Sequence, residues 1–388
     1  MVAGFAAFSG MSRFFERGNA LATSRLLGLI SIFLALMVRW ESVALIGIGW
    51  AWSELIFPIH SRVKAVSLAV IISILAVSTF IGKRIHEQKN VEPSFLEFNR
   101  ARAKVIDHPS FVSHYSTIAF EPDSDWFFFS RWIFEELPID LDQLTKKKEE
   151  LDQRLFTWKE VGSGLYRLIL IQLTELFKGM LILALIIGFF SLRFELKKKL
   201  TYFLIWLIFF LIFNHFNMLL GRVIFLFFII LLFPILNYPR LYPSFSFLKY
   251  VSYVFFIFIG VHLFNFLKYS EGRKLVNKEF NTLINDIHVD KPIFIEGIFE
   301  YVFTDHFSRI NPVPILSNGW ISRSPFQLKA YKLRGFSKQS DLFSFYLIAP
   351  RIPEPLVFPE YMNKISSGFM EKKVTETSNL ELLYFYKK

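Results

Sequence analysis

Two carboxylates separated by one residue, Asp123 and Asp125, stand directly before the aromatic run 126–129. Hard divalent cations take oxygen ligands, so this pair could hold Mg²⁺ or Mn²⁺ against a diphosphate, although nothing in the pattern requires a cofactor. Asp125 could also act as a general base toward an acceptor hydroxyl, with Asp123 assisting and Trp126 against a sugar or lipid. A turn leading into an amphipathic helix at the bilayer surface would explain the same residues without chemistry.

A basic cluster precedes this pair in the stretch FNRARAKVIDHP, residues 98–109. The forked donors of Arg100 and Arg102 suit a phosphate group, and His108 could serve as an acid–base or metal-binding group. The alternative is a helix whose basic side meets lipid head groups and which Asp107 and His108 end before the proline. We expect substrate-binding roles for the two arginines and the histidine, and a structural role for Asp107.

A third motif-like stretch, SNGWISRSP, covers residues 317–325. Gly319 permits a tight turn, and Trp320 with Arg323 could present a flat aromatic face beside a cation. Such a surface would suit a carbohydrate. A structural turn before the next element would produce the same letters.

Several ionisable residues fall within apolar stretches, where burial is costly without a partner. Glu175 and Lys178 are three apart, which is the spacing of a pair on one helix face, so we expect a structural pairing. His215 and Arg222 lie near the exterior end of a predicted span and could line a cavity there. An ion or proton pathway could instead use a set of four such residues: Glu54, Glu175, Lys178 and His262.

The composition places these residues in a membrane protein. Apolar residues make up 53% of the 388 positions and the chain has 48 Phe, which is too much apolar surface for a soluble core. The net charge of +11 lies mostly beside apolar stretches, where it orients spans and meets anionic lipid, so no nucleic acid is expected. The absence of cysteine excludes disulfides and thiolate chemistry.

The sequence predicts an α-helical polytopic membrane protein with about seven spans, each of roughly 20 apolar residues. Residues 1–20 could form an interfacial helix, and 223–236 could pair with the preceding span as a re-entrant hairpin. The predicted spans are 21–38, 42–59, 65–81, 165–192, 200–220, 223–236 and 247–266.

Orientation follows from Lys and Arg in the short connections, which favour the cytoplasmic side. These residues concentrate before the first span, between the second and third, and between the fourth and fifth. The pattern predicts a cytoplasmic N-terminus and an exterior C-terminus. The predicted domains are N-terminal transmembrane helices at 1–82, an exterior polar loop domain at 83–163, C-terminal transmembrane helices at 164–267 and an exterior α/β domain at 268–388.

The C-terminal segment carries short apolar runs that alternate with helical patterns. KPIFI, VPILSN, SFYLIAP and LELLYFYK are typical of buried strands, and residues 298–307 and 360–369 of helices. Strands alternating with helices predict a small α/β domain.

The three stretches FNRARAKVIDHP, EPDSDWFFFSRW and SNGWISRSP together resemble a loosely defined set of bacterial polytopic membrane proteins associated with surface-polysaccharide genes. The layout is also similar to lipid-linked-sugar glycosyltransferases of the GT-C type. It departs from them because the acidic loop follows the third span rather than the first, and because the spans number about seven rather than nine or more. The first resemblance implies no activity and picks out Asn99, Arg102, Asp107, Asp125, Trp126, Gly319, Trp320 and Pro325, with structural roles for Asn99, Gly319 and Pro325.

The sequence is compatible with three functions. The leading hypothesis is a bacterial inner-membrane protein of surface-glycan assembly or modification, in the form of a glycosyltransferase that takes a polyprenyl-phosphate-linked sugar and a glycan acceptor. Its other partners would be membrane lipids. The second hypothesis is a non-catalytic scaffold whose exterior segments pack together and bind a partner, and the third is a transporter.

Overall fold

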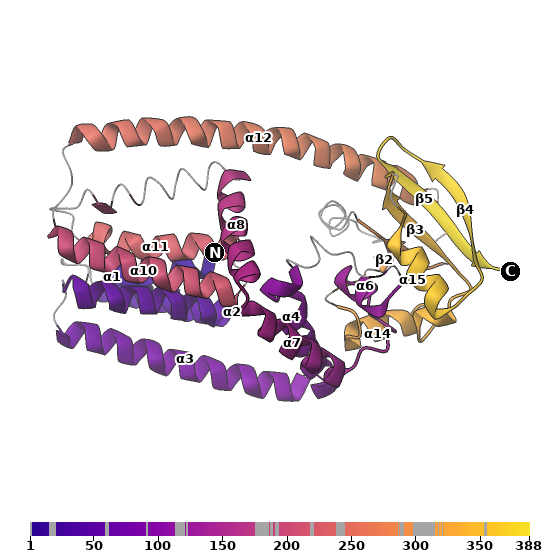
Figure 1. Ribbon diagram of the computed structural model, residues 1–388, viewed down its shortest axis with the longest axis horizontal. Helices are drawn as coiled ribbons and strands as arrows, with labels where there is room; N and C mark the ends of the chain where they lie inside the picture. The colour runs from indigo at the N-terminus through magenta and orange to yellow at the C-terminus, as the bar shows by residue number, and fades with distance from the viewer. Residues whose placement is uncertain are drawn as a thin grey trace. The chain divides into compact units, whose positions relative to one another are not determined.

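The computed structural model describes residues 2–14, 21–58, 62–90, 92–112, 121, 123–174, 186, 189–190, 194–217, 221–237, 245–285, 287, 291–297, 315–316, 318–319, 321–352 and 355–388. It is mostly helical and has one small sheet near the C-terminus, as the sequence predicts (Figure 1). The chain divides into two compact units, each made of two separate stretches. We call them the helical unit, Met1–Val91 with Arg154–His262, and the α/β unit, Glu92–Gln153 with Leu263–Lys388.

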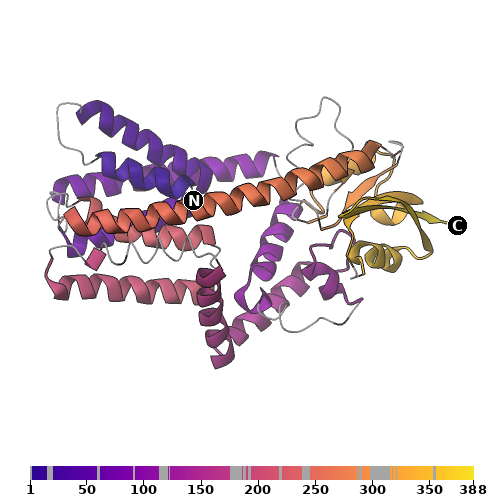
Figure 2. The same cartoon turned by 90° about the horizontal axis from the view of Figure 1, so that it is seen from above.

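The helical unit contains the apolar helices. Three described helices are long and apolar enough to cross a membrane, at Thr23–Ile56, Arg62–Glu87 and Leu196–Phe216. A single helix runs on from this unit into the α/β unit (Figure 2). The helices of the unit are α1 (Val2–Phe14), α2 (Leu21–Ile56), α3 (Arg62–Asn90), α8 (Trp158–Thr174), α10 (Leu196–Phe216), α11 (Gly221–Asn237) and the first part of α12 (Phe245–Asn285).

The bounds of the predicted spans agree with those of these helices to different extents. The first two both fall within α2, where non-helical backbone at Arg39 separates them. The predicted span 165–192 lies mostly outside the described residues beyond α8, and the last two correspond to α11 and α12. The total of seven spans and their orientation therefore stay predictions.

The side chains of α3 show why lipid is the natural surroundings of this unit. Val66, Val70 and Ile74 are all more than half exposed along the helix. Water would penalise this apolar surface, whereas the hydrocarbon core of a bilayer matches it. The structure thus contains helices suited to a membrane.

Inside the helical unit, α10 compensates a break in the hydrogen bonding of α11. Pro234 lies within α11 and has no N–H to donate to the carbonyl of Ile230, four residues earlier. The buried hydroxyl of Tyr202 donates to that carbonyl at 3.0 Å, and Trp206 Nε1 donates to the carbonyl of Phe227 at 2.8 Å. Neighbouring helices commonly satisfy the backbone groups that proline frees in an apolar environment.

The α/β unit joins the central polar segment to the C-terminal one. The central segment contributes α4 (Pro93–Ile106), α6 (Asp125–Ser130) and α7 (Leu141–Leu155). The C-terminal segment contributes the end of α12 and then β1 (Ile293–Ile295), β2 (Ile315–Leu316), α14 (Pro325–Lys332), η2 (Gln339–Asp341), β3 (Ser344–Pro350), α15 (Val357–Ile365), β4 (Phe369–Glu376) and β5 (Leu380–Lys387).

The five strands form one mixed sheet in the order β2-β1-β3-β5-β4. β1 pairs in parallel with both β2 and β3, whereas β5 runs antiparallel to β3 and β4. Successive side chains along a strand point to opposite faces of a sheet, so both faces of β1, β3 and β5 carry apolar residues. Each face is covered by a different part of the chain.

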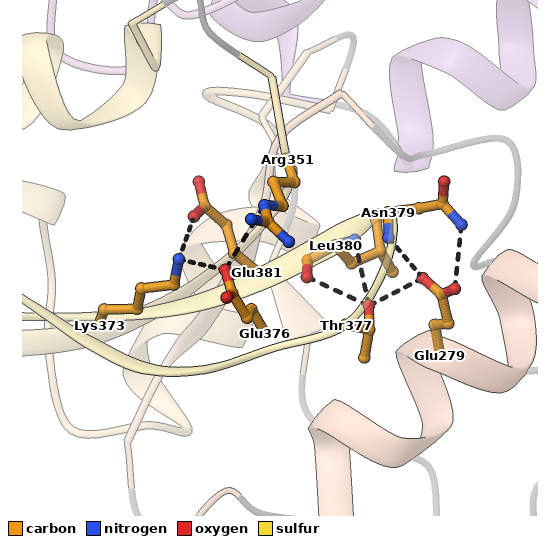
Figure 3. Close-up of polar contacts among 8 residues, drawn as sticks. All are labelled: Glu279, Arg351, Lys373, Glu376, Thr377, Asn379, Leu380 and Glu381. Carbon is orange, nitrogen blue, oxygen red and sulfur yellow. Dashed lines mark hydrogen bonds and ion pairs between the residues drawn. The ribbon is translucent and has the colours of Figure 1, made fainter.

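The end of α12 packs against one face of the sheet. Phe280 and Leu283 belong to a small core with Ile348 of β3 and Leu382 of β5. Glu279, one residue before Phe280, fixes the hairpin between β4 and β5 (Figure 3). Its carboxylate accepts hydrogen bonds from Thr377 Oγ1 at 2.8 Å and from the backbone N–H and side-chain amide of Asn379 at 3.0 Å each.

The central polar segment shares the core on the other face. Phe128 and Phe129 of α6 are fully buried in a cluster that includes Phe345 of β3 and Leu383 of β5. The ring of Phe128 meets that of Tyr361 in α15 at 5.7 Å between centroids. The two polar segments, separated in sequence by the apolar helices 154–262, are therefore one folded unit.

Candidate ligand-binding site

The α6–α7 loop, residues 131–140, is held in place by one arginine of the C-terminal segment. Arg323 Nε donates to the carbonyls of Phe134 and Glu135 at 3.0 Å each. Its Nη1 donates to the carbonyl of Ile139 at 2.9 Å, and its Nη2 to that of Leu137 at 2.5 Å. One guanidinium thus satisfies four carbonyls of a loop that has no regular secondary structure.

Two further contacts hold the same loop. The carboxylate of Glu136 accepts from the backbone N–H of Ser340 at 3.0 Å and from its hydroxyl at 2.5 Å. The backbone N–H of Glu136 donates to the hydroxyl of Tyr361 at 2.9 Å. The loop is therefore positioned from three different elements of the C-terminal segment.

Glu135 is the buried acid of this loop. Its Oε2 accepts from the backbone N–H of Arg323 at 2.7 Å. Burial raises the pKa of Glu135 to about 7, although the hydrogen bond and charge of Arg323 act in the opposite direction. The loop thus contains a carboxyl group that titrates near neutral pH.

The α6–α7 loop presents Trp132 in an unusual backbone conformation. Trp132 has φ +66°, in the left-handed region that costs a residue with a Cβ. The guanidinium of Arg102 in α4 lies 5.0 Å from its ring centroid and 5.3 Å from that of Phe134. Arg102 is 5% exposed, and its Nη2 donates to Asn99 at 2.7 Å. Burial lowers the pKa of Arg102, whereas the charge of Asp107 raises it.

Trp132 also lines a cavity of about 240 Å³ at the carboxyl end of the parallel strands. Glu296 and Gly297 directly follow β1, and Asn318 follows β2. β1 has parallel neighbours on both sides, and in open α/β sheets the carboxyl ends at such a point are where ligands bind. The cavity is lined by Arg131, Trp132, Ile133, Ile295, Glu296, Gly297, Asn318, Val357 and Phe358.

Glu296 connects this cavity to α15. Its carboxylate accepts from the backbone N–H groups of Val357 at 2.8 Å and Phe358 at 3.0 Å, which are unsatisfied donors of the first helical turn. Burial raises the pKa of Glu296, and these two hydrogen bonds oppose the shift. Gly297 has φ +71°, and a Cβ there would lie 3.0 Å from Pro350. The turn after β1 therefore requires glycine.

The predicted acidic pair lies elsewhere in the α/β unit, against α15. Lys364 Nζ lies 2.7 Å from Asp125 Oδ1 and donates to the backbone carbonyl of Asp123 at 2.5 Å. Asp123 has φ +67°, and Ser124 caps α6 by accepting from the N–H of Phe127. An ammonium group therefore neutralises Asp125 in this structure, and binding of a divalent cation by the pair stays a prediction. Within the described part of the chain, no group of three or more His, Asp or Glu side chains could hold a metal.

The basic cluster is divided by the structure. Arg102 is buried, whereas Arg100 of the same helix is exposed. Asp107 follows the last turn of α4, as expected for a residue that ends a helix. His108 is buried beside Asp152 of α7, with Nε2 3.3 Å from Oδ1.

The third motif serves the turn before α14. The backbone N–H of Gly319, at φ +117°, donates to Ser322 Oγ at 3.2 Å. Ser324 caps α14 and Pro325 occupies its first turn, where proline is favoured. Arg323 binds the α6–α7 loop and stays partly exposed, so its predicted contact with a ligand remains a prediction. Trp320 lies outside the described residues.

The remaining predicted residues do not line this cavity or lie outside the described residues. Trp126 packs edge-on against Phe129 at 5.2 Å, with Lys147 Nζ 5.5 Å from its ring. His215 lies in the last turn of α10, and Arg222 lies at the start of α11 with its side chain outside the description. Glu175, Lys178 and the predicted helix 298–307 also lie outside the described residues.

Sequence reasoning did not select Arg131, Trp132, Glu296 and Asn318 as site residues. A signal for two of them existed, because Glu296 follows one predicted buried strand, Asn318 ends another, and parallel strands bring their carboxyl ends together. No pattern in the sequence connects Trp132 to those strands. Trp132 is brought to those strands by the hydrogen bonds of Arg323 to the α6–α7 loop and by the hydrophobic core that α6 shares with the sheet.

The fold and the cavity define a class: a protein with membrane-type helices and an α/β unit that carries a strand-end cavity. Comparison with protein-family models, with curated protein sequences and with solved structures finds no match for this chain.

Proposed function

We propose that the chain is a bacterial inner-membrane protein that binds a sugar-bearing ligand in the assembly or modification of a surface glycan. The strand-end cavity supports this proposal best. It combines an aromatic ring, a guanidinium, a carboxyl and an amide around an apolar floor, which is the lining of a small-ligand site. An aromatic face stacks on the C–H groups of a sugar ring, and the polar groups suit its hydroxyls.

In its simpler form, this proposal describes a protein that binds the ligand and does not use Asp125 as a catalytic base. Asp125 is paired with Lys364, and both side chains are about one-third exposed. A general base must reach the proton that it removes, and this ion pair occupies the carboxylate. The glycosyltransferase hypothesis therefore needs the pair to open on binding, whereas a binding scaffold does not.

The shared core of the α/β unit also supports the proposed topology. A membrane cannot pass through one hydrophobic core, so the shared core supports placing residues 92–153 and 268–388 on the same side of it. The stretch between them then crosses the membrane an even number of times. The four spans proposed there satisfy this condition, and we place the α/β unit outside the cytoplasm on the basis of the Lys and Arg distribution.

The test is mass spectrometry of lipid-linked and surface glycans in cells that lack the gene, complemented with variants of equal membrane abundance. Trp132→Gly removes the aromatic ring and relieves the positive φ, so we expect the wild-type glycan profile to be lost. Unchanged glycans in the deletion strain would reject the glycan function altogether.

A matched pair of variants separates binding from catalysis in the same cells. If the ion pair is structural, Asp125→Asn and Lys364→Met should have similarly small effects on the glycan profile. If Asp125 is the base, Asp125→Asn should abolish the product and Lys364→Met should preserve it. The second result would support a glycosyltransferase and reject a non-catalytic binding scaffold.

A further inference from the structure

Within the helical unit, α8 packs against the end of α10. The buried side-chain amide of Asn214, in the last turn of α10, donates to the carbonyl of Gly164 in α8 at 3.3 Å. The ring of Phe156, just before α8, meets that of Phe216, the last residue of α10, at 6.1 Å between centroids. In both views α8 runs across α10 rather than along it (Figures 1 and 2). A helix thus crosses the end of a second helix that is long and apolar enough to span a membrane.

The two sides of α8 differ in exposure. One side is buried in the helical unit at positions that recur every four residues: Glu160, Gly164 and Leu168. The other side is exposed and largely apolar. Trp158 is 89% exposed, Tyr166 is 66% exposed and Leu165, beside it, is 45% exposed. The rings of the outer side are therefore accessible.

This outer side has the composition of a helix that lies in a membrane surface. Trp and Tyr gather at that level because their rings enter the apolar region while the indole N–H and the phenol O–H stay among the head groups. Lys159 is exposed next to Trp158, and its ammonium group suits the phosphate of a lipid. Water alone would penalise the exposed apolar area, whereas a bilayer surface matches both kinds of group.

We propose that α8 lies in the bilayer surface, with its outer side at the boundary between lipid head groups and acyl chains. Its position on α10 favours lipid over a protein partner. α10 has 21 residues, about 31 Å of helix, which is close to the thickness of the hydrocarbon core. Its end at Phe216 therefore lies near a membrane surface, and α8 crosses at that level. The lipid-facing surface of the helical unit continues onto α8.

This inference is independent of the proposed glycan function and refines the topology. The predicted span 165–192 would begin after α8 instead of at residue 165. Residues 175–192 are apolar enough in sequence and sufficient in length to cross the hydrocarbon core, so the even number of spans is kept.

The experiment measures the depth of α8 in the full-length protein in phosphatidylcholine nanodiscs. Because the chain has no cysteine, Gly162→Cys can carry the fluorophore NBD as the one label. Gly162 is exposed one helical turn from both Trp158 and Tyr166, and a Cβ there meets no atom within 4 Å. We expect blue-shifted emission, and stronger quenching by lipids that carry a nitroxide near the head group than by lipids that carry it near the end of the acyl chain.

Two exposed reference positions calibrate the depth. Ile208→Cys, in the middle of α10, should be quenched more by the deep nitroxide, and Lys329→Cys, in α14, should be quenched by neither. Lys159→Cys is a second position on α8 and should repeat the order found at Gly162→Cys. A result like that of Lys329→Cys, or like that of Ile208→Cys, would overturn the proposal. Blue-shifted emission that neither nitroxide quenches would also overturn it, because protein, such as a second copy of the chain, would then cover this side of α8.

Discussion

Arg323 shows how far a residue type in a motif determines its role. Its spacing beside Gly319 and Trp320 suggested a cation on a recognition surface. The structure instead directs the guanidinium at four carbonyls of the α6–α7 loop, 184 to 189 residues away in sequence. Arginine is suited to this because its planar fork carries five donors, whereas lysine has three on a single nitrogen.

Glu135, on the same loop, gives the α/β unit a dependence on pH. Its folded pKa of about 7 exceeds its ordinary value of 4.5, so the folded state holds this proton more tightly than the unfolded state. Stability is then greatest below about pH 4.5 and falls as the pH rises through about 7, by about 3 kcal/mol at most. Arg323 and Glu136 are the charged groups that face Glu135 and act on its pKa.

Glu135→Gln should remove this loss, because the amide keeps an acceptor for the N–H of Arg323 and carries no charge. We expect its thermal midpoint to exceed that of the wild type at pH 8 and the difference to shrink toward pH 5. Intrinsic fluorescence of the full-length protein in nanodiscs measures both midpoints. A difference that does not change with pH would contradict the assigned titration.

At the scale of elements, α1 and α2 approach each other through two glycines. A Cβ at Gly28 would lie 2.6 Å from the carbonyl oxygen of Gly10, and one at Gly10 would lie 2.5 Å from that of Gly28. Small residues at such crossings let helix backbones pack closely in membranes. The sequence suggested an interfacial helix within residues 1–20, whereas α1 buries Ala3, Ala7 and Met11 in the core of the helical unit.

Gly28→Ala should therefore force α1 and α2 apart, because the clash is with backbone that no rotamer change can relieve. We expect reduced accumulation in the membrane and a lower thermal midpoint. Gly47→Ala is the matched control within α2, since a Cβ there would meet only Met11 at an ordinary 3.8 Å. Equal behaviour of the two variants would show that the crossing tolerates a wider spacing.

Strands with apolar alternation were predictable, and those without it were not. The four predicted strands contain β1, β2, β3 and β5. β4 was missed because its sequence, FMEKKVTE, is largely charged and exposed, as suits an edge strand. A proline also marks the boundary between two helices: α3 ends at Asn90 and α4 begins at Pro93, since proline disfavours a helical residue before it.

At the scale of the whole molecule, the sequence indicates membrane helices and an α/β segment but not their pairing into two units. An apolar face on α6 shows that Phe128 and Phe129 need a partner, without showing that the partner is β3 or α15. Contacts such as Arg323 to Phe134 are set by three-dimensional packing of distant segments. For the same reason the strand-end cavity, with Trp132 on one wall, could not be assembled from local pattern.

The shared core makes a prediction about topology that the lack of cysteine allows to be tested cleanly. Lys146→Cys and Lys388→Cys report on the two stretches of the α/β unit, and Lys197→Cys reports on the first turn of α10. A membrane-impermeant thiol reagent should label the first two in intact spheroplasts and the third only after permeabilisation. Labelling of Lys146→Cys and Lys388→Cys on opposite sides would contradict a single α/β unit.

The division of the α/β unit into two stretches also sets the order of events during synthesis. The carbonyls of the α6–α7 loop that Arg323 binds emerge from the ribosome 184 to 189 residues before it, with the apolar helices made in between. At about 5 to 20 residues per second, Phe128, Phe129 and Phe134 wait roughly ten to forty seconds for the segment that covers them. Until then the loop and α6 lack the partners that cover them, so we expect a protease to cleave the loop in the newborn chain and not in the folded protein.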